Sequence, residues 1–173
     1  MADQTLLESH ELNALGYLPE SESLAKSAWT LNQWIDESTL RDIEGELGVA
    51  PGDLRVRVDH ADWLMNAARQ ICANDEETDP ILLDADVELI EILDIMRNRI
   101  PNGCKEDLLS LISIRGVGRV RARTLANHGY RTPLEICRIT KNAAQKLADE
   151  RGWSPLLVQN IMQAAERAIQ TKR

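Results

Sequence analysis

Apolar residues recur every three to four positions along most of this chain, which is the spacing of helices that bury one face. No segment alternates between apolar and polar residues in the way of a half-buried strand. In the first hundred residues the pattern predicts helices at 6–15, 22–35, 39–47, 51–73 and 81–98. Local signals support these bounds, because Pro51 and Asp53 are typical of a helix start and Gly48 of a helix end.

The rest of the chain predicts five shorter helices, at 105–113, 119–128, 133–138, 141–150 and 155–170. The third of these should begin with a capping box, because Thr132 is followed three residues later by Glu135. The run Pro101-Asn102-Gly103 is expected to break the helix before it. We therefore predict an all-α fold with two domains, at residues 1–103 and 104–173.

One short stretch carries a distinct pattern, in which Gly116 and Gly118 flank the apolar Val117. Glycines let the backbone turn tightly and approach a ligand closely. The helix that follows such a turn begins with free backbone N–H groups, which favour an anion such as phosphate. Four arginines add positive charge and forked donors: Arg115, Arg119, Arg121 and Arg123. The stretch predicts a helix–hairpin–helix that binds a nucleic-acid backbone.

The same pattern returns 36 residues later, where Arg151-Gly152-Trp153-Ser154 aligns with Arg115-Gly116-Val117-Gly118. The second copy has Ser154 where the first has a glycine. We therefore predict a helical bundle followed by a tandem helix–hairpin–helix domain, in which the first hairpin binds and the degenerate second hairpin mainly packs.

Charge is divided unevenly along the chain. Residues 1–100 hold 7 Lys and Arg against 22 Asp and Glu, a net charge of −15, whereas residues 101–173 hold 13 against 6, a net charge of +7. The net charge of −8 therefore conceals a basic region. Because the glycine turn lies in that region, the overall acidity does not exclude nucleic-acid binding.

Composition narrows the class of protein. Apolar residues make up 43% of the 173 residues, which is enough for a packed core. Three widely spaced cysteines favour free thiols in a reducing compartment, so we expect a cytoplasmic protein. The longest apolar run, Ile81 to Met96, carries five acidic residues and excludes a membrane span. Neither a metal site nor a cofactor is expected, because the histidines and cysteines lack ligand spacing.

Two blocks together resemble a known family. The first runs from Lys26 through Leu31-Asn32-Gln33-Trp34-Ile35-Asp36-Glu37 to Gly48-Val49-Ala50-Pro51-Gly52-Asp53-Leu54 and Ala61-Asp62-Trp63-Leu64. The second is Ile114-Arg115-Gly116-Val117-Gly118-Arg119-Val120-Arg121-Ala122-Arg123. In this order they resemble the C-terminal region of archaeal Ski-two-like superfamily-two DNA helicases, relatives of the helicase part of polymerase theta. The resemblance covers roughly residues 22 to 170.

The resemblance implies that residues 1–103 are the latter part of a ratchet-like helical bundle and that 104–173 bind the emerging DNA strand. In the family the motor domains hydrolyse ATP, and a long bundle helix stacks an aromatic residue and an arginine on single-stranded DNA. The 173 residues contain no GxxxxGK[ST] loop, so the chain is not expected to be an enzyme by itself. Expected partners are single-stranded or branched DNA and a helicase motor domain or repair protein.

The predicted helix at 51–73 holds the candidate stacking residue, Trp63. It lies about 180° from Leu54, on the side opposite the expected core face. Stacking on bases and burial by another helix both remain open for it. Val56 occupies the position one heptad earlier, and Arg55 and Arg57 flank it, with Arg55 the preferred partner. Two further tryptophans, Trp29 and Trp34, are predicted to be core residues.

Three functions compete with that of a DNA-binding module. A regulatory module could dock its acidic half on a helicase or repair partner, with DNA binding incidental. A base-excision glycosylase would need a catalytic Asp beyond the hairpin, and residues 132–138 contain none. RNA binding stays open, because contacts to the backbone distinguish ribose from deoxyribose only through the 2′-OH.

Overall fold

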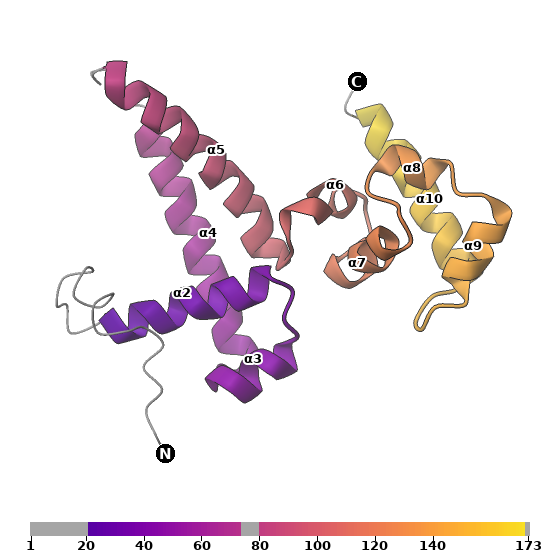
Figure 1. Cartoon of the computed structure of the whole chain (residues 1–173), viewed down its shortest axis with the longest axis horizontal. Helices are drawn as coiled ribbons and strands as arrows, with labels where there is room; N and C mark the ends of the chain where they lie inside the picture. The colour runs from indigo at the N-terminus through magenta and orange to yellow at the C-terminus, as the bar shows by residue number, and fades with distance from the viewer. Residues whose placement is uncertain (1–20, 74–79, 172–173) are drawn as a thin grey trace. The chain divides into compact units, whose positions relative to one another are not determined.

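The computed structural model describes residues 21–73 and 80–171, and all regular structure within these residues is helical, as predicted (Figure 1). The chain divides into two compact units, Met1–Gly103 and Cys104–Arg173. The helix predicted at 6–15 and most of the predicted loop at 74–80 lie outside the described residues. No helix in the described ranges is long and apolar enough to cross a membrane.

The described part of the first unit contains four helices, α2 (Ser21–Ile35), α3 (Leu40–Leu47), α4 (Pro51–Ala73) and α5 (Pro80–Asn102). The two long helices, α4 and α5, lie side by side (Figure 1). An ion pair joins them, with Arg69 Nε 2.6 Å from Asp94 Oδ1. Residues from all four helices and the loop after α3 form one core: Ile35, Ile43, Val49, Leu54, Val58, Ala61 and Ile100.

Local chemistry sets the ends of α3 and α5. Thr39 caps α3 through a capping box with Asp42, and Gly48 closes it in the left-handed conformation. The fifth helix ends within the run Pro101-Asn102-Gly103, as expected, but α5 continues to Asn102, beyond the predicted end at residue 98, with Pro101 inside it. A proline this close to the C-terminus removes only one of the last helical hydrogen bonds. Gly103, at φ 59°, ends the helix instead.

The second unit consists of short helices followed by one long helix. They are the 3₁₀ helix η1 (Glu106–Leu108), α6 (Leu109–Ile112), α7 (Arg119–Asn127), α8 (Pro133–Cys137), α9 (Lys141–Ala148) and α10 (Pro155–Thr171). The single helix predicted at 105–113 is therefore wrong in its first turn. No side chain caps η1 or α6, and tighter 3₁₀ bonding is common in such short, uncapped turns.

The core of the second unit is apolar and well enclosed. Fully buried side chains come from all six helices of the unit: Leu108, Leu111, Leu125, Ile136, Leu147 and Ala165. The capping box predicted at Thr132 is confirmed, since its hydroxyl accepts from the Glu135 N–H and the Glu135 carboxylate accepts from the Thr132 N–H. The capping box therefore fixes the first turn of α8.

Candidate nucleic-acid interface

The turn between α6 and α7 has the backbone geometry that its two glycines allow. Gly116 adopts a φ of 85°, which other residues rarely adopt. The N–H of Val117 donates to the carbonyl of Ile114 at 3.0 Å, and the Val117 side chain is buried in the core of the unit. Val117 therefore anchors the turn from inside. Neither its side chain nor its N–H is available to a ligand.

Gly118 is the residue that caps α7, and it has no side chain with which to do so. The first helical bond runs from the Ala122 N–H to the Gly118 carbonyl at 2.9 Å. Within the described residues, the N–H groups of Gly118, Val120 and Arg121 have no acceptor. A Cβ built on Gly118 would meet nothing within 4 Å, and the φ of −87° suits any residue. Neither conformation nor packing inside the chain therefore requires a glycine here.

The turn between α9 and α10 repeats this backbone closely. Gly152 has a φ of 84°, the Trp153 N–H donates to the Glu150 carbonyl at 3.0 Å, and the Val158 N–H donates to the Ser154 carbonyl at 3.1 Å. The helix that follows presents fewer free donors, although the N–H groups of Ser154 and Leu156 have no acceptor among the described residues. Pro155 has no N–H, and the Leu157 N–H donates to the Ser154 hydroxyl at 3.2 Å. The two turns share a shape and differ in how many free donors they present.

The arginines around the first turn differ in their exposure and in their contacts. Arg115 is exposed at the turn itself. Arg121 reaches back so that its Nη1 donates to the Gly116 carbonyl at 2.7 Å, which braces the turn. Arg119, the first residue of α7, is half-buried. The sequence pattern placed these cations at the turn, but it did not indicate that one of them holds the turn together.

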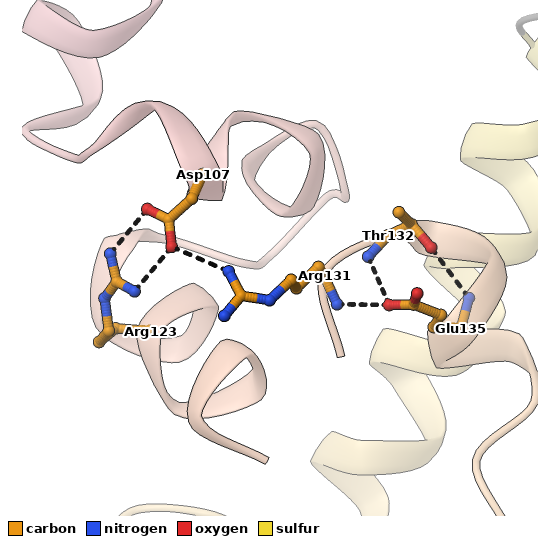
Figure 2. A network of polar contacts seen from close by, with 5 residues as sticks. All are labelled: Asp107, Arg123, Arg131, Thr132 and Glu135. Carbon is orange, nitrogen blue, oxygen red and sulfur yellow. Dashed lines mark hydrogen bonds and ion pairs between the residues drawn. The ribbon is translucent and has the colours of Figure 1, made fainter. Parts of the chain in front are cut away.

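Arg123 is engaged with a carboxylate that sequence reasoning missed. Its two terminal nitrogens each lie 2.9 Å from one oxygen of Asp107, in a two-pronged ion pair (Figure 2). Arg131 Nη1 lies 3.4 Å from the same carboxylate. The hydrogen bond from Arg123, opposed in part by desolvation, holds the pKa of Asp107 below its ordinary value. Asp107 lies 16 residues from Arg123, so no helical spacing in the sequence could reveal this pair.

Of the candidate residues of α4, Arg55 and Trp63 are exposed and Arg57 is half-buried. Trp63 is 67% exposed, so no described helix buries it. Arg55 pairs with Asp59, with Nη2 3.0 Å from Oδ1, and Arg57 donates from Nη1 to the Asp53 carbonyl at 3.2 Å. Both arginines therefore already have partners on their own helix. Trp34 packs against the core of the first unit as predicted, but the prediction that Trp29 is a core residue is wrong, since it is 41% exposed.

Sequence reasoning also missed the apolar neighbours of Trp63. Three further large apolar side chains are exposed on α4, namely Val56 at 53%, Leu64 at 58% and Ile71 at 72%. Val56 and Trp63 are seven residues apart, as are Leu64 and Ile71, so the four side chains form one stripe about 100° wide on the side away from the buried Leu54 and Val58. The spacing was readable in the sequence. It was overlooked because the same helix already shows an apolar face for the core.

Comparison with known proteins places these features in a family. Residues 5–102 match the family model described as archaeal helicase, domain 4. The match covers more than half of the chain, and the chain therefore belongs to this archaeal helicase family.

Three of its relatives are each named ATP-dependent DNA helicase Hel308. The protein from Pyrobaculum calidifontis is 38% identical over 151 residues, which cover 87% of this chain and 20% of the relative. Those from Thermoplasma acidophilum and Thermoplasma volcanium are 30% and 31% identical and cover 93% and 91% of this chain and 22% of each relative. The chain spans about a fifth of the length of these curated relatives. The family resemblance drawn from the two sequence blocks is confirmed.

Proposed function

We propose that this chain is a non-catalytic DNA-binding module of an ATP-dependent DNA helicase, directed to the backbone of single-stranded or branched DNA. In this proposal the segments α6–turn–α7 and α9–turn–α10 form a tandem helix–hairpin–helix domain, and α2 to α5 belong to a ratchet-like bundle. ATP hydrolysis belongs to motor domains, whose phosphate-binding loop does not occur among the 173 residues.

The observation that carries the proposal is the difference between the two glycine turns. A helix N-terminus with unsatisfied N–H groups attracts an anion, and the effect requires that no side chain caps it. At the first turn Gly118 leaves the donors of Gly118, Val120 and Arg121 open. At the second turn Pro155 has no N–H and Ser154 caps Leu157, so that only the donors of Ser154 and Leu156 stay open. We infer that a phosphate takes the open donors, and that Arg115 and Arg119 add charge beside it.

In this proposal the remaining candidate residues make fewer contacts with DNA than the sequence predicted. Gly116 and Val117 shape the turn, and Arg121 braces it through the Gly116 carbonyl. Contacts of this kind bind backbone and not base sequence. The proposal assigns base contact to Trp63, whose exposed ring can stack on an unpaired base. Because Arg55 and Arg57 have partners on α4, we give them a weaker part than the family resemblance implied.

Titration of a labelled single-stranded oligonucleotide at several salt concentrations tests the proposal. Binding should weaken with salt, with a log–log slope of about −0.7 for each neutralised phosphate. Arg115→Ala combined with Arg119→Ala should reduce both affinity and slope. The matched control is Arg138→Ala combined with Arg167→Ala, which removes the same charge from positions away from the turn. Equal losses in both double variants would remove the turn from the site.

The apolar stripe on α4 favours a second candidate, a protein-interaction module. Beside Trp63, the side chains of Val56, Leu64 and Ile71 expose aliphatic surface that base stacking does not need. The surrounding unit is acidic, which suits a basic partner such as a helicase motor domain or repair protein. Absence of oligonucleotide binding even at low salt would favour this function over the first.

A further inference from the structure

Two arginines from different segments of the second unit converge on the carboxylate of Asp107. Arg123 comes from the middle of α7, and Arg131 from the loop before α8. Oδ2 of Asp107 lies 2.9 Å from Nη1 of Arg123 and 3.4 Å from Nη1 of Arg131 (Figure 2). Two guanidinium groups around one oxygen form an oxyanion site, which here is filled by a side chain of the same unit.

The position of Arg123 connects this site to the first glycine turn. Arg119 and Arg123 are four residues apart on α7 and so lie on one face of the helix. That face begins at the end of α7 where the N–H groups of Gly118, Val120 and Arg121 are open. The guanidinium of Arg123 would therefore continue the positive surface by one helical turn, but Asp107 neutralises it.

Arg131 is fixed at its backbone and not at its side chain. Its N–H donates to Oε2 of Glu135 at 2.6 Å, which ties the loop to the cap of α8. Its side chain is 62% exposed, and its contact with Asp107 is longer than that of Arg123. The guanidinium can consequently change its anionic partner while the loop stays in place.

We propose that Asp107 acts as an internal competitor for phosphate, which withholds Arg123 and Arg131 from the polynucleotide. The inference rests on the proposed function. A phosphate presents oxygens to a guanidinium fork in the same manner as a carboxylate, so the exchange replaces one oxyanion by another. The lowered pKa of Asp107 agrees with this arrangement, because it shows that the arginines favour the charged carboxylate. Asp107 thereby limits the affinity of the unit for DNA.

Asp107→Asn tests the proposal, and Glu106→Gln is its matched control. Glu106 precedes Asp107 in η1 and is exposed, so its replacement changes the charge equally without releasing either arginine. Asp107→Asn should bind single-stranded DNA about three- to tenfold more tightly than Glu106→Gln at low salt. The slope of log affinity against log salt should steepen by about 0.7 for each phosphate gained. Equal affinity and slope in the two variants would overturn the proposal.

A second pair of variants covers the case in which Asp107→Asn unfolds, which circular dichroism would detect. With Asp107 intact, Arg123→Gln combined with Arg131→Gln should lose no more affinity than Arg138→Gln combined with Arg167→Gln. A greater loss would show that the two arginines already bind DNA, and would contradict the proposal. Failure of the wild-type chain to bind DNA at any salt concentration would instead count against the proposed function.

Discussion

The indole ring of Trp34 occupies the space that a Cβ on Gly103 would need. Three ring atoms of Trp34 would overlap that Cβ, and the indole Nε1 donates to the carbonyl of Ile100 at 2.8 Å. Gly103 also adopts a φ of 59° and donates from its N–H to the Arg99 carbonyl at 2.8 Å. One side chain from α2 thus holds the C-terminal turn of α5.

This relationship predicts that Gly103→Ala destabilises the protein. The positive φ alone costs more than about 1 kcal/mol, and overlap with the indole adds about 1–3 kcal/mol. Gly45→Ala is the matched control, because Gly45 lies in α3 with open space around it. That change should be neutral or stabilising by up to about 1 kcal/mol. Chemical denaturation of both variants would measure the difference, and equal stabilities would contradict the argument.

Substitutions at two tryptophans of the first unit should change protein stability and DNA affinity independently. Because Trp63 is 67% exposed, Trp63→Ala should change the free energy of unfolding by no more than about 0.5 kcal/mol. It should weaken binding of single-stranded DNA by about 1–3 kcal/mol for each base that stacks. Trp34→Ala should instead cost about 3–5 kcal/mol in stability. Unchanged DNA affinity in a folded Trp63→Ala variant would leave the apolar stripe to protein partners.

Exchanging the caps of the two turns should separate folding from DNA binding. Gly118→Ser supplies α7 with the hydroxyl that Ser154 supplies to α10, so stability should rise by a few tenths of a kcal/mol, about 0.3. The new side chain should occupy donors that a phosphate would use and thereby lower DNA affinity. Ser154→Gly should not lower affinity, because it frees the Leu157 N–H and so gives the second turn the same open donors as the first. A Gly118→Ser variant that binds DNA as well as the wild type would argue against the open donors.

Acid should weaken the second unit through Asp107 and Glu135. The backbone N–H of Arg131 and the cap at Thr132 lower the pKa of Glu135, as Arg123 lowers the pKa of Asp107. With both values lowered in the folded state, the unfolded chain binds protons first as pH falls. Stability should therefore be constant near neutral pH and decline below about pH 4, where free carboxylates titrate.

Glu135→Gln checks this assignment, because the amide oxygen can still cap α8 without titrating. Its thermal unfolding temperature should fall less steeply between about pH 5 and about pH 3 than that of the wild type. An identical pH profile in the two proteins would assign the acid sensitivity to other groups.

Much of the helical fold was readable from the sequence because its signals are local. Pro51 begins α4 at a position where its missing N–H leaves no donor unsatisfied, and the capping box of Thr132 and Glu135 satisfies donors at the start of α8. Both helices begin where these signals predict. The last turn of α5 was missed because a proline tolerated there looks the same in sequence as one that ends a helix. Trp29 misled because apolar character does not tell which side of α2 is covered.

The candidate site was only partly predictable from the sequence, because local signals do not show which distant residues come into contact. The glycine pattern indicated the turn at Gly116. Only the folded unit shows that the Val117 N–H is hydrogen-bonded and that the Gly118 N–H has no acceptor among the described residues. The ion pair of Arg123 with Asp107 joins residues from separate segments, and only the folded unit brings them together.

Backbone amide chemical shifts, followed by nuclear magnetic resonance during titration with a single-stranded oligonucleotide, show whether a phosphate binds the open donors at the start of α7. The N–H groups of Gly118, Val120 and Arg121 should shift in a saturable, salt-dependent manner, while that of Leu157 at the second turn, which the Ser154 hydroxyl already accepts, should stay unchanged. An equal response at the second turn, or DNA binding without any change at Gly118, Val120 and Arg121, would contradict phosphate binding at the first turn.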